Sequence, residues 1–148
     1  MIKIYDPQEL IRFYSRQDSE SLRMRFCRFM NTETITKYAN DVIHSENICS
    51  NAIVENGEIV AVIDSFFMTY TLGLRTVEIG LMVDKNHRNK GLGKKLFAET
   101  IKRAIPDYAD IVRSHCMRSN CWMTKICIDH GMQIETFGTE IIATSLKK

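Results

Sequence analysis

Hydrophobic and polar residues follow two different spacings along this chain, and the change comes near residue 46. Before that point apolar residues recur at helical intervals, which is typical of amphipathic helices. After it, apolar and polar residues alternate or form short apolar runs, which is typical of strands. The pattern predicts a short strand over 1–5 and helices over 9–14, 19–30 and 32–44, with Asp18 or Ser19 as the N-cap of the second helix.

Two strands over 48–55 and 58–70 flank Asn56-Gly57, a pair that supplies the positive φ angles of a tight hairpin turn. The next strand, over 76–83, has two unlike faces. Its apolar face carries Val77, Ile79, Leu81 and Val83, and its other face carries Glu78, Gly80 and Met82.

The last part of the chain alternates helices and strands. A helix over 91–105 is predicted to end at Pro106, because proline disfavours helical geometry in the residue before it. A strand over 110–116, a helix over 120–129 that stops at His130-Gly131, and strands over 133–137 and 140–146 follow. This order of elements predicts an α/β (α+β) fold in which helices flank a mixed sheet.

Composition fits one ordinary domain over 1–148, with 45% apolar and 26% charged residues. The N-terminus lacks a basic stretch followed by an apolar run, and no apolar segment is long enough for a bilayer, so we expect neither a signal peptide nor a membrane partner. Five cysteines form an odd set, which favours free thiols and a cytoplasmic location. A net charge of +2 argues against nucleic acid as the main partner.

Positive charge gathers in one place, between Lys85 and Lys95. Within this segment Gly91 and Gly93 stand at the predicted start of a helix. Unpaired first-turn amides, the helix dipole, and glycines that let an anion approach the backbone suit such a segment to phosphate. Neither the P-loop pattern nor the dinucleotide-binding glycine pattern is present. The alternative is a basic helix start whose glycines serve only the turn.

The strand Glu78-Ile-Gly-Leu-Met-Val83 and the loop Arg88-Asn-Lys-Gly-Leu-Gly93 resemble the acetyl-CoA-binding core of the GNAT superfamily, whose loop pattern is Arg/Gln-x-x-Gly-x-Gly/Ala. Matches to the second GNAT motif are Asn120, Met123, Ile126, Gly131 and Met132. The resemblance implies a GNAT fold with a mostly antiparallel central sheet, acetyl-CoA as cosubstrate and a primary amine as acceptor. A shorter segment, matched at Glu20, Ser21, Arg25 and Phe26, resembles bacterial Pat-type protein-lysine acetyltransferases.

The resemblance also assigns the cofactor positions. It implies that the strand backbone pairs with the pantetheine arm, that loop amides hold the pyrophosphate, and that an N–H of Met82 or Val83 binds the oxyanion. Asn120 is expected to contact pantetheine or to position the neighbouring strand, and the alternative is that it acts only as a helix cap. Asn89 replaces the usual glycine, and asparagine tolerates left-handed backbone well. The cofactor positions are Leu81, Met82, Val83, Arg88, Asn89, Lys90, Gly91, Leu92, Gly93, Lys94 and Asn120.

Two residues carry the expected catalytic roles. Glu78 stands where Pat-type enzymes have their catalytic glutamate, which implies that it deprotonates the acceptor amine; the alternative is a solvent-facing strand residue. Many GNAT enzymes place a tyrosine acid where this chain has Cys127. Because a thiol donates a proton weakly, Cys127 is either a weak acid or a buried apolar residue.

Three functions stay open at this stage: transfer to a protein lysine, transfer to a small-molecule amine, and acetyl-CoA binding without turnover. His115 is expected either at an acceptor site or as a packed or surface histidine, and Trp122, Met123 and Met132 are expected in the core. No metal is expected, because Cys116, Cys121, Cys127 and His130 lack the paired spacing of zinc sites. An edge strand at the C-terminus would allow two chains to pair as a homodimer.

Overall fold

The computed structural model describes residues 1–69 and 72–146, except for the side chains of 104–107 and 146, and in this part of the chain seven strands form one sheet in the order β1-β2-β3-β4-β5-β7-β6. Every neighbouring pair of these strands is antiparallel except β4 and β5. The strands are β1 (Ile2–Lys3), β2 (Ile48–Glu55), β3 (Glu58–Thr69), β4 (Arg75–Val83), β5 (Ile111–Met117), β6 (Gln133–Phe137) and β7 (Glu140–Leu146). The helices are α1 (Pro7–Ser15), α2 (Ser19–Phe26), α3 (Thr32–His44), α4 (Leu92–Tyr108) and α5 (Cys121–Asp129), and the 3₁₀ turn η1 (Lys85–His87) precedes α4.

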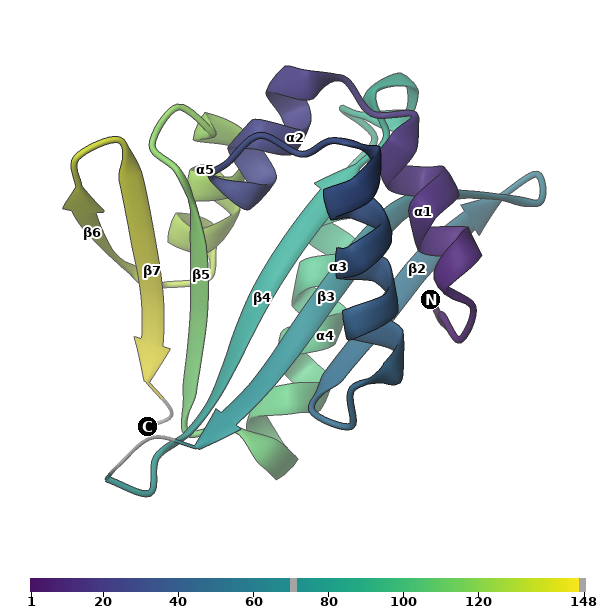
Figure 1. Ribbon diagram of the computed structural model, residues 1–148. Helices are drawn as coiled ribbons and strands as arrows, with labels where there is room; N and C mark the ends of the chain where they lie inside the picture. Colours follow the sequence, from purple (N-terminus) through teal and green to yellow (C-terminus); the bar gives the residue numbers. More distant parts are fainter. Residues whose placement is uncertain (70–71, 147–148) are drawn as a thin grey trace.

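Helices cover both faces of the sheet (Figure 1). On one face α1, α2 and α3 surround a core that includes Tyr14, Val42 and Met82. On the other face α4 and α5 surround a core that includes Leu96 and Ile126. The expected mixed α/β fold, with helices flanking a mostly antiparallel sheet, is confirmed. None of the helices in the described ranges combines the length and apolar content needed to cross a lipid bilayer.

Strand β4 separates the two cores, as its alternating pattern predicts. Val77, Ile79, Leu81 and Val83 lie in the core under α4 and α5, whereas Met82 lies in the core under α1 to α3. Glu78 shares the face of Met82, and its side chain is 25% exposed. A carboxylate therefore stands at the edge of the N-terminal helical layer, where solvent and a ligand can reach it.

Strands β4 and β5 pair over a short stretch and then diverge (Figure 1). Their register runs only from Thr76 opposite Ile111 to Glu78 opposite Arg113, although both strands continue beyond these pairs. One side-chain bond follows, from the Oγ of Ser114 to the carbonyl of Ile79 at 3.0 Å. Past this point the edge of β4 that faces β5 has no strand partner among the described residues.

Two helices end elsewhere than the sequence pattern predicts. α2 stops at Phe26 rather than at residue 30, because Cys27 adopts a left-handed conformation (φ 59°) and donates its N–H to the carbonyl of Arg23. α4 continues past Pro106 to Tyr108, since a proline this close to a helix end removes one N–H donor without stopping the turn. Tyr70, expected at the end of β3, lies outside the described residues.

Candidate functional site

A cleft of about 260 Å³ occupies the space where β4 and β5 diverge; we call it the β4–β5 cleft. Its walls are Leu81, Met82 and Val83 of β4, the residues that begin α5, and part of α2. The structure thus brings together four residues that the sequence assigned to the cofactor from two distant motifs: Leu81, Met82, Val83 and Asn120. Arg88 also lines the cleft from the loop between β4 and α4.

The loop of residues 84–91, which we call the β4–α4 loop, presents free backbone donors at the start of α4. Asn89 and Gly91 have φ angles of 63° and 76°, so Asn89 adopts the left-handed conformation expected of its position. The first helical bond of α4 runs from the N–H of Lys95 to the carbonyl of Gly91 at 3.1 Å. Within the described residues, no backbone hydrogen bond is donated by residues 88–94. Amides of this kind, backed by the helix dipole, bind anions.

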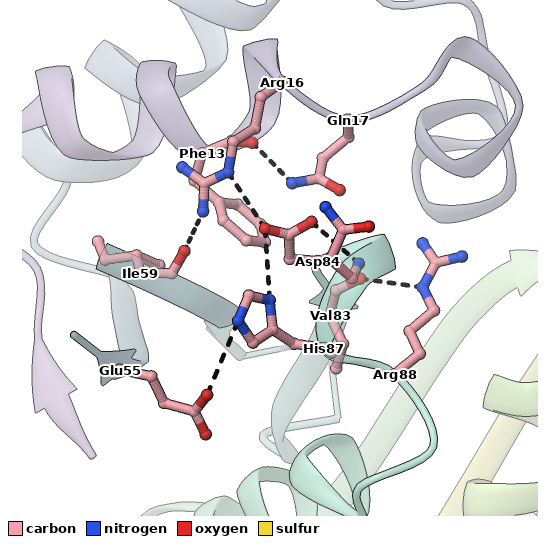
Figure 2. A network of polar contacts seen from close by, with 10 residues as sticks. Phe13, Arg16, Gln17, Glu55, Ile59, Val83, Asp84, His87 and Arg88 are labelled. Atoms are coloured by element: carbon pink, nitrogen blue, oxygen red, sulfur yellow. Dashed lines mark hydrogen bonds and ion pairs between the residues drawn. The ribbon is translucent and has the colours of Figure 1, made fainter. Parts of the chain in front are cut away.

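Asp84 fixes the start of the β4–α4 loop (Figure 2). Its carboxylate pairs with Nε of Arg16 at 3.2 Å and lies 3.7 Å from Nδ1 of His87. His87 lies in turn 3.8 Å from Glu55, and Arg16 also donates to the carbonyl of Ile59. The loop is therefore held against α1 and against the β2–β3 hairpin, which reduces the entropy that a ligand must remove when it binds.

Arg88 folds back onto the protein beside the cleft. Its Nε donates to the carbonyl of Val83 at 3.1 Å, as Figure 2 shows, and its Nη2 donates to the Oγ of Ser21 at 3.1 Å. Asp18 accepts from the N–H of Ser21 at 2.7 Å, and this bond lowers the pKa of Asp18 below its usual value. Arg88 thus connects the end of β4 to the first turn of α2.

Trp122 lies at the cleft rather than in the core, so the expectation of a core tryptophan is wrong. Its side chain is 41% exposed and lines the β4–β5 cleft. Its ring packs against Gly93: a Cβ added there would come within 2.2 Å of the indole. Only a glycine lets the first turn of α4 approach the ring so closely. Met123 and Met132 are buried, as expected.

The helix-cap role considered for Asn120 is confirmed. Its Oδ1 accepts from the N–H of Met123 at 3.2 Å, so it is the N-cap of α5. It also lines the cleft. The cap holds the start of α5, and with it Trp122, against the open edge of β4.

A second pocket, of about 240 Å³, adjoins the cleft along β4, and we call it the Glu78 pocket. Glu78 and Gly80 line it from β4, and His115 lines it from β5. The Oε2 of Glu78 accepts from Nη2 of Arg113 at 3.3 Å. His115 lines this pocket and is 40% exposed, so it is not a packed histidine. No sequence motif marked Arg113, because its pairing with Glu78 depends on the register of β4 and β5.

Arg25 forms the wall between the two cavities, since it lines both of them. Its side chain is 11% exposed, and its Nη2 lies 3.4 Å from Asp64 and 3.2 Å from the hydroxyl of Tyr38. Its Nε is buried without a hydrogen-bond partner among the described residues. The sequence marked Arg25 only through the short Pat-like segment.

The buried carboxylate of Asp64 anchors this arginine. It accepts hydrogen bonds from the hydroxyls of Tyr14 (2.7 Å), Tyr38 (2.6 Å) and Ser50 (2.6 Å). Burial raises the pKa values of Tyr14 and Tyr38 well above normal, and Asp64 adds to the shift. Burial lowers the pKa of Arg25, but Tyr38, Tyr14 and Asp64 outweigh it, so the net shift is upward and Arg25 stays charged.

Cys127 lies apart from both cavities. It is fully buried in the core under α4 and α5, and it lines neither the β4–β5 cleft nor the Glu78 pocket. Burial raises the pKa of its thiol to about 11, partly offset by a hydrogen bond with Ser114. The structure therefore does not bring Cys127 together with Glu78.

Comparisons with known proteins agree with this geometry. The family model for the acetyltransferase (GNAT) family matches residues 9–125. The GNAT domain of S. lividans PAT is similar in structure, with a TM-score of 0.80 and 17% identity over 99% of this chain and 88% of that one. Ribosomal-protein-alanine N-acetyltransferase from Brucella melitensis gives 0.72 and 12% over 99% and 100% of the two chains.

A further similar structure is Arabidopsis thaliana NAA60 in complex with a bisubstrate analogue, with a TM-score of 0.70 and 15% identity over 95% of this chain and 94% of that one. At such low identity the likeness to these solved structures is one of fold. No curated protein sequence matches the chain.

Proposed function

The chain belongs to the GNAT family of acetyltransferases, which transfer an acetyl group from acetyl-CoA to an amine, and from this premise we propose that Glu78 deprotonates an acceptor that enters through the Glu78 pocket. The observation that carries the proposal is the adjacency of two cavities along β4. Glu78 lines one of them, Arg88, the first residue of the segment with free amides, lines the other, and Arg25 lines both.

Acetyl-CoA fits the β4–β5 cleft through backbone chemistry. The edge of β4 that faces β5 offers the N–H and C=O groups of Leu81 and Val83 to the two amides of pantetheine, as an added strand would, whereas the backbone groups of Met82 face β3. The first-turn amides of Leu92, Gly93 and Lys94 offer donors to the pyrophosphate. Around them Lys85, Asn89 and Lys90 are exposed, and the two lysines contribute charge that attracts the ligand.

Glu78 is the base of the proposed reaction. An alkylamine with a pKa of about 10.4 is almost wholly protonated at neutral pH and must lose a proton before it can attack the thioester. In the Glu78 pocket the carboxylate is partly exposed and is oriented by Arg113, so it can accept that proton directly or through one water. The amine nitrogen then forms a bond with the acetyl carbon.

The rest of the reaction needs little from side chains. We assign stabilisation of the oxyanion of the tetrahedral intermediate to the backbone N–H of Val83, because the strand register directs the N–H of Met82 toward β3. The C–S bond then breaks, the electron pair leaves on sulfur, and the second proton of the attacking nitrogen passes to solvent or to the departing thiolate. A thiol pKa of about 8.5 makes this thiolate a good leaving group without an acid. We place no step on Cys127, because its burial separates it from the cleft.

A protein lysine is the acceptor that we favour, because the Pat-like match at Glu20, Ser21, Arg25 and Phe26 lies on α2, which lines both cavities. A small-molecule amine is the second candidate. The observation that favours it is the presence of a second carboxylate, Glu140, which lies 2.8 Å from the His115 that lines the Glu78 pocket. Two carboxylates near one pocket suit a polycationic acceptor such as a polyamine.

The test is a transfer assay with lysine peptides and polyamines as acceptors, alongside titration with acetyl-CoA. We expect Glu78→Gln to lower kcat by about 100-fold or more while acetyl-CoA affinity is retained. Glu135→Gln, on the exposed strand β6, is the matched control and should keep wild-type turnover. Undiminished turnover in Glu78→Gln would refute the role of Glu78. Binding of acetyl-CoA without turnover on any amine would instead leave a cofactor-binding module.

A further inference from the structure

Three potential metal ligands meet at one corner of the Glu78 pocket. They are the Sγ of Cys27, an imidazole nitrogen of His115 and a carboxylate oxygen of Glu140, and these atoms all lie within 4.8 Å of one another. The Nε2 of His115 is 2.8 Å from the Oε1 of Glu140. Among the described residues, these three potential ligands lie close enough together to hold one metal ion.

The fold explains why these distant residues meet. His115 on β5 is opposite Ile142 of β7, and Glu140 is two residues before Ile142, so the two side chains are diagonal neighbours on one face of the sheet. Cys27 is the left-handed residue that ends α2, and α2 packs against β5. The cluster therefore joins the N-terminal helical layer to the C-terminal half of the sheet.

We propose that Cys27, His115 and Glu140 form a binding site for a divalent transition metal, with zinc as the natural candidate. Three atoms within 4.8 Å of one another leave a point within about 2.8 Å of all three, and zinc bonds of about 2.0–2.3 Å need only sub-ångström closure from there. Thiolate, imidazole and carboxylate together suit zinc better than magnesium or calcium, which take oxygen ligands. On binding, the Cys27 thiol releases its proton to solvent and the thiolate sulfur bonds the ion.

Access and coordination number fit the same proposal. The side chains of His115 and Glu140 are 40% and 38% exposed, so an ion can reach them from solvent. Cys27 and His115 also line the Glu78 pocket. Three protein ligands leave a fourth tetrahedral position for water or another small ligand. Cys116, Cys121, Cys127 and His130, whose spacing was compared with that of zinc sites in the sequence analysis, are not part of this group.

A bound ion would weaken binding of the amine acceptor and would not change binding of acetyl-CoA. It occupies the wall of the Glu78 pocket, adds positive charge where a cationic amine would enter, and lies outside the residues that line the β4–β5 cleft. Zinc should therefore raise the KM for the amine without weakening acetyl-CoA binding. This kinetic consequence depends on the proposed transferase reaction, whereas the metal site itself does not.

The test is direct titration of the metal-free, reduced protein with Co²⁺, which reports tetrahedral coordination and a thiolate ligand in its absorption spectrum, followed by competition with Zn²⁺. We expect a thiolate-to-cobalt band in the wild type and its loss in Cys27→Ser. His115→Asn and Glu140→Gln should weaken Co²⁺ binding by more than about 10-fold, the loss seen when even an outer-shell partner of a ligand is removed. Cys49→Ser, a cysteine of β2 outside the cluster, is the matched control and should bind like the wild type.

Two results would overturn the proposal: a wild-type spectrum without the thiolate band, or any of the three cluster variants binding Co²⁺ as tightly as the wild type. Circular dichroism of each variant separates loss of a ligand from loss of the fold. Because this readout needs no acetyl transfer, a failure of the proposed function would not affect it.

Discussion

The guanidinium of Arg25 packs against Gly80 so closely that a Cβ added at Gly80 would come within 2.0 Å of it. Gly80 stands on β4 between Glu78 and the residues that line the β4–β5 cleft. Because Arg25 is held by Asp64 and Tyr38, it cannot move aside without losing these contacts. The glycine and the arginine therefore set the boundary between the two cavities together.

Gly80→Ala should test this pairing. We expect a loss of about 1–3 kcal/mol in the free energy of unfolding, the usual cost of overpacking a filled site, measured by urea denaturation. The cost should shrink in an Arg25→Ala background, where the side chain that clashes is absent. Equal costs in both backgrounds would show that Gly80 is needed for another reason.

Removing the charge of Asp64 should cost more than removing any surface carboxylate. Asp64→Asn takes away the charge that faces Arg25 and two tyrosine hydroxyls, so we expect a loss of about 3–5 kcal/mol in the free energy of unfolding. Asp41→Asn is the control and should cost under about 0.5 kcal/mol, because Asp41 is exposed and pairs with the exposed Lys37 one turn earlier. Chemical denaturation of both variants decides between these values.

Gly91 should be essential for both its shape and its lack of charge, and two substitutions separate these properties. Gly91→Asn keeps a residue that tolerates the φ of 76°, so we expect little change in acetyl-CoA affinity. Gly91→Glu adds a carboxylate beside the free amides of α4 and should weaken binding by about 10-fold or more. Calorimetric titration measures both. Equal affinities in the two variants would place the pyrophosphate elsewhere.

Trp122 should report cofactor binding by its fluorescence, since it is the only tryptophan in the chain and lines the β4–β5 cleft. We expect acetyl-CoA to change the emission in a saturable way, with a midpoint equal to the calorimetric Kd. Gly93→Ala should shift the emission of the free protein, because the methyl group displaces the ring. An emission unaffected by saturating acetyl-CoA would argue against a ligand in this cleft.

Stability should fall at alkaline pH because of Cys116 and Cys127. Burial raises their pKa values from about 9 to about 12 and about 11, so unfolding lets these thiols lose their protons more readily. The raised pKa values mean that this part of the stability is complete below pH 9 and is lost as the pH rises toward 11 and 12. Urea denaturation from pH 8 to pH 11 should show a shallower decline in a Cys116→Ala, Cys127→Ala double variant.

Local patterns predicted the elements of this fold, and contacts between distant segments account for what they missed. The alternation in β4 and the Asn56-Gly57 turn are local, and the structure has both where the sequence placed them. The pairing of Glu78 with Arg113 depends on strand register. Trp122 was assigned to the core on hydrophobicity alone, but its position is set by its contact with Gly93.

The ion pair between Asp84 and Arg16, the C-cap residue of α1, connects α1 to the β4–α4 loop, which is far from it in the sequence. Asp84 is a mostly buried carboxylate at the start of the β4–α4 loop, which is suited to an anion, and Arg16 offsets its negative charge. A shortened protein without α1 and Arg16 would leave that charge uncompensated, and it would then repel the pyrophosphate that we propose binds at the loop. Any minimal fragment cut from this chain to bind acetyl-CoA therefore has to retain α1, although α1 lines no part of the cleft.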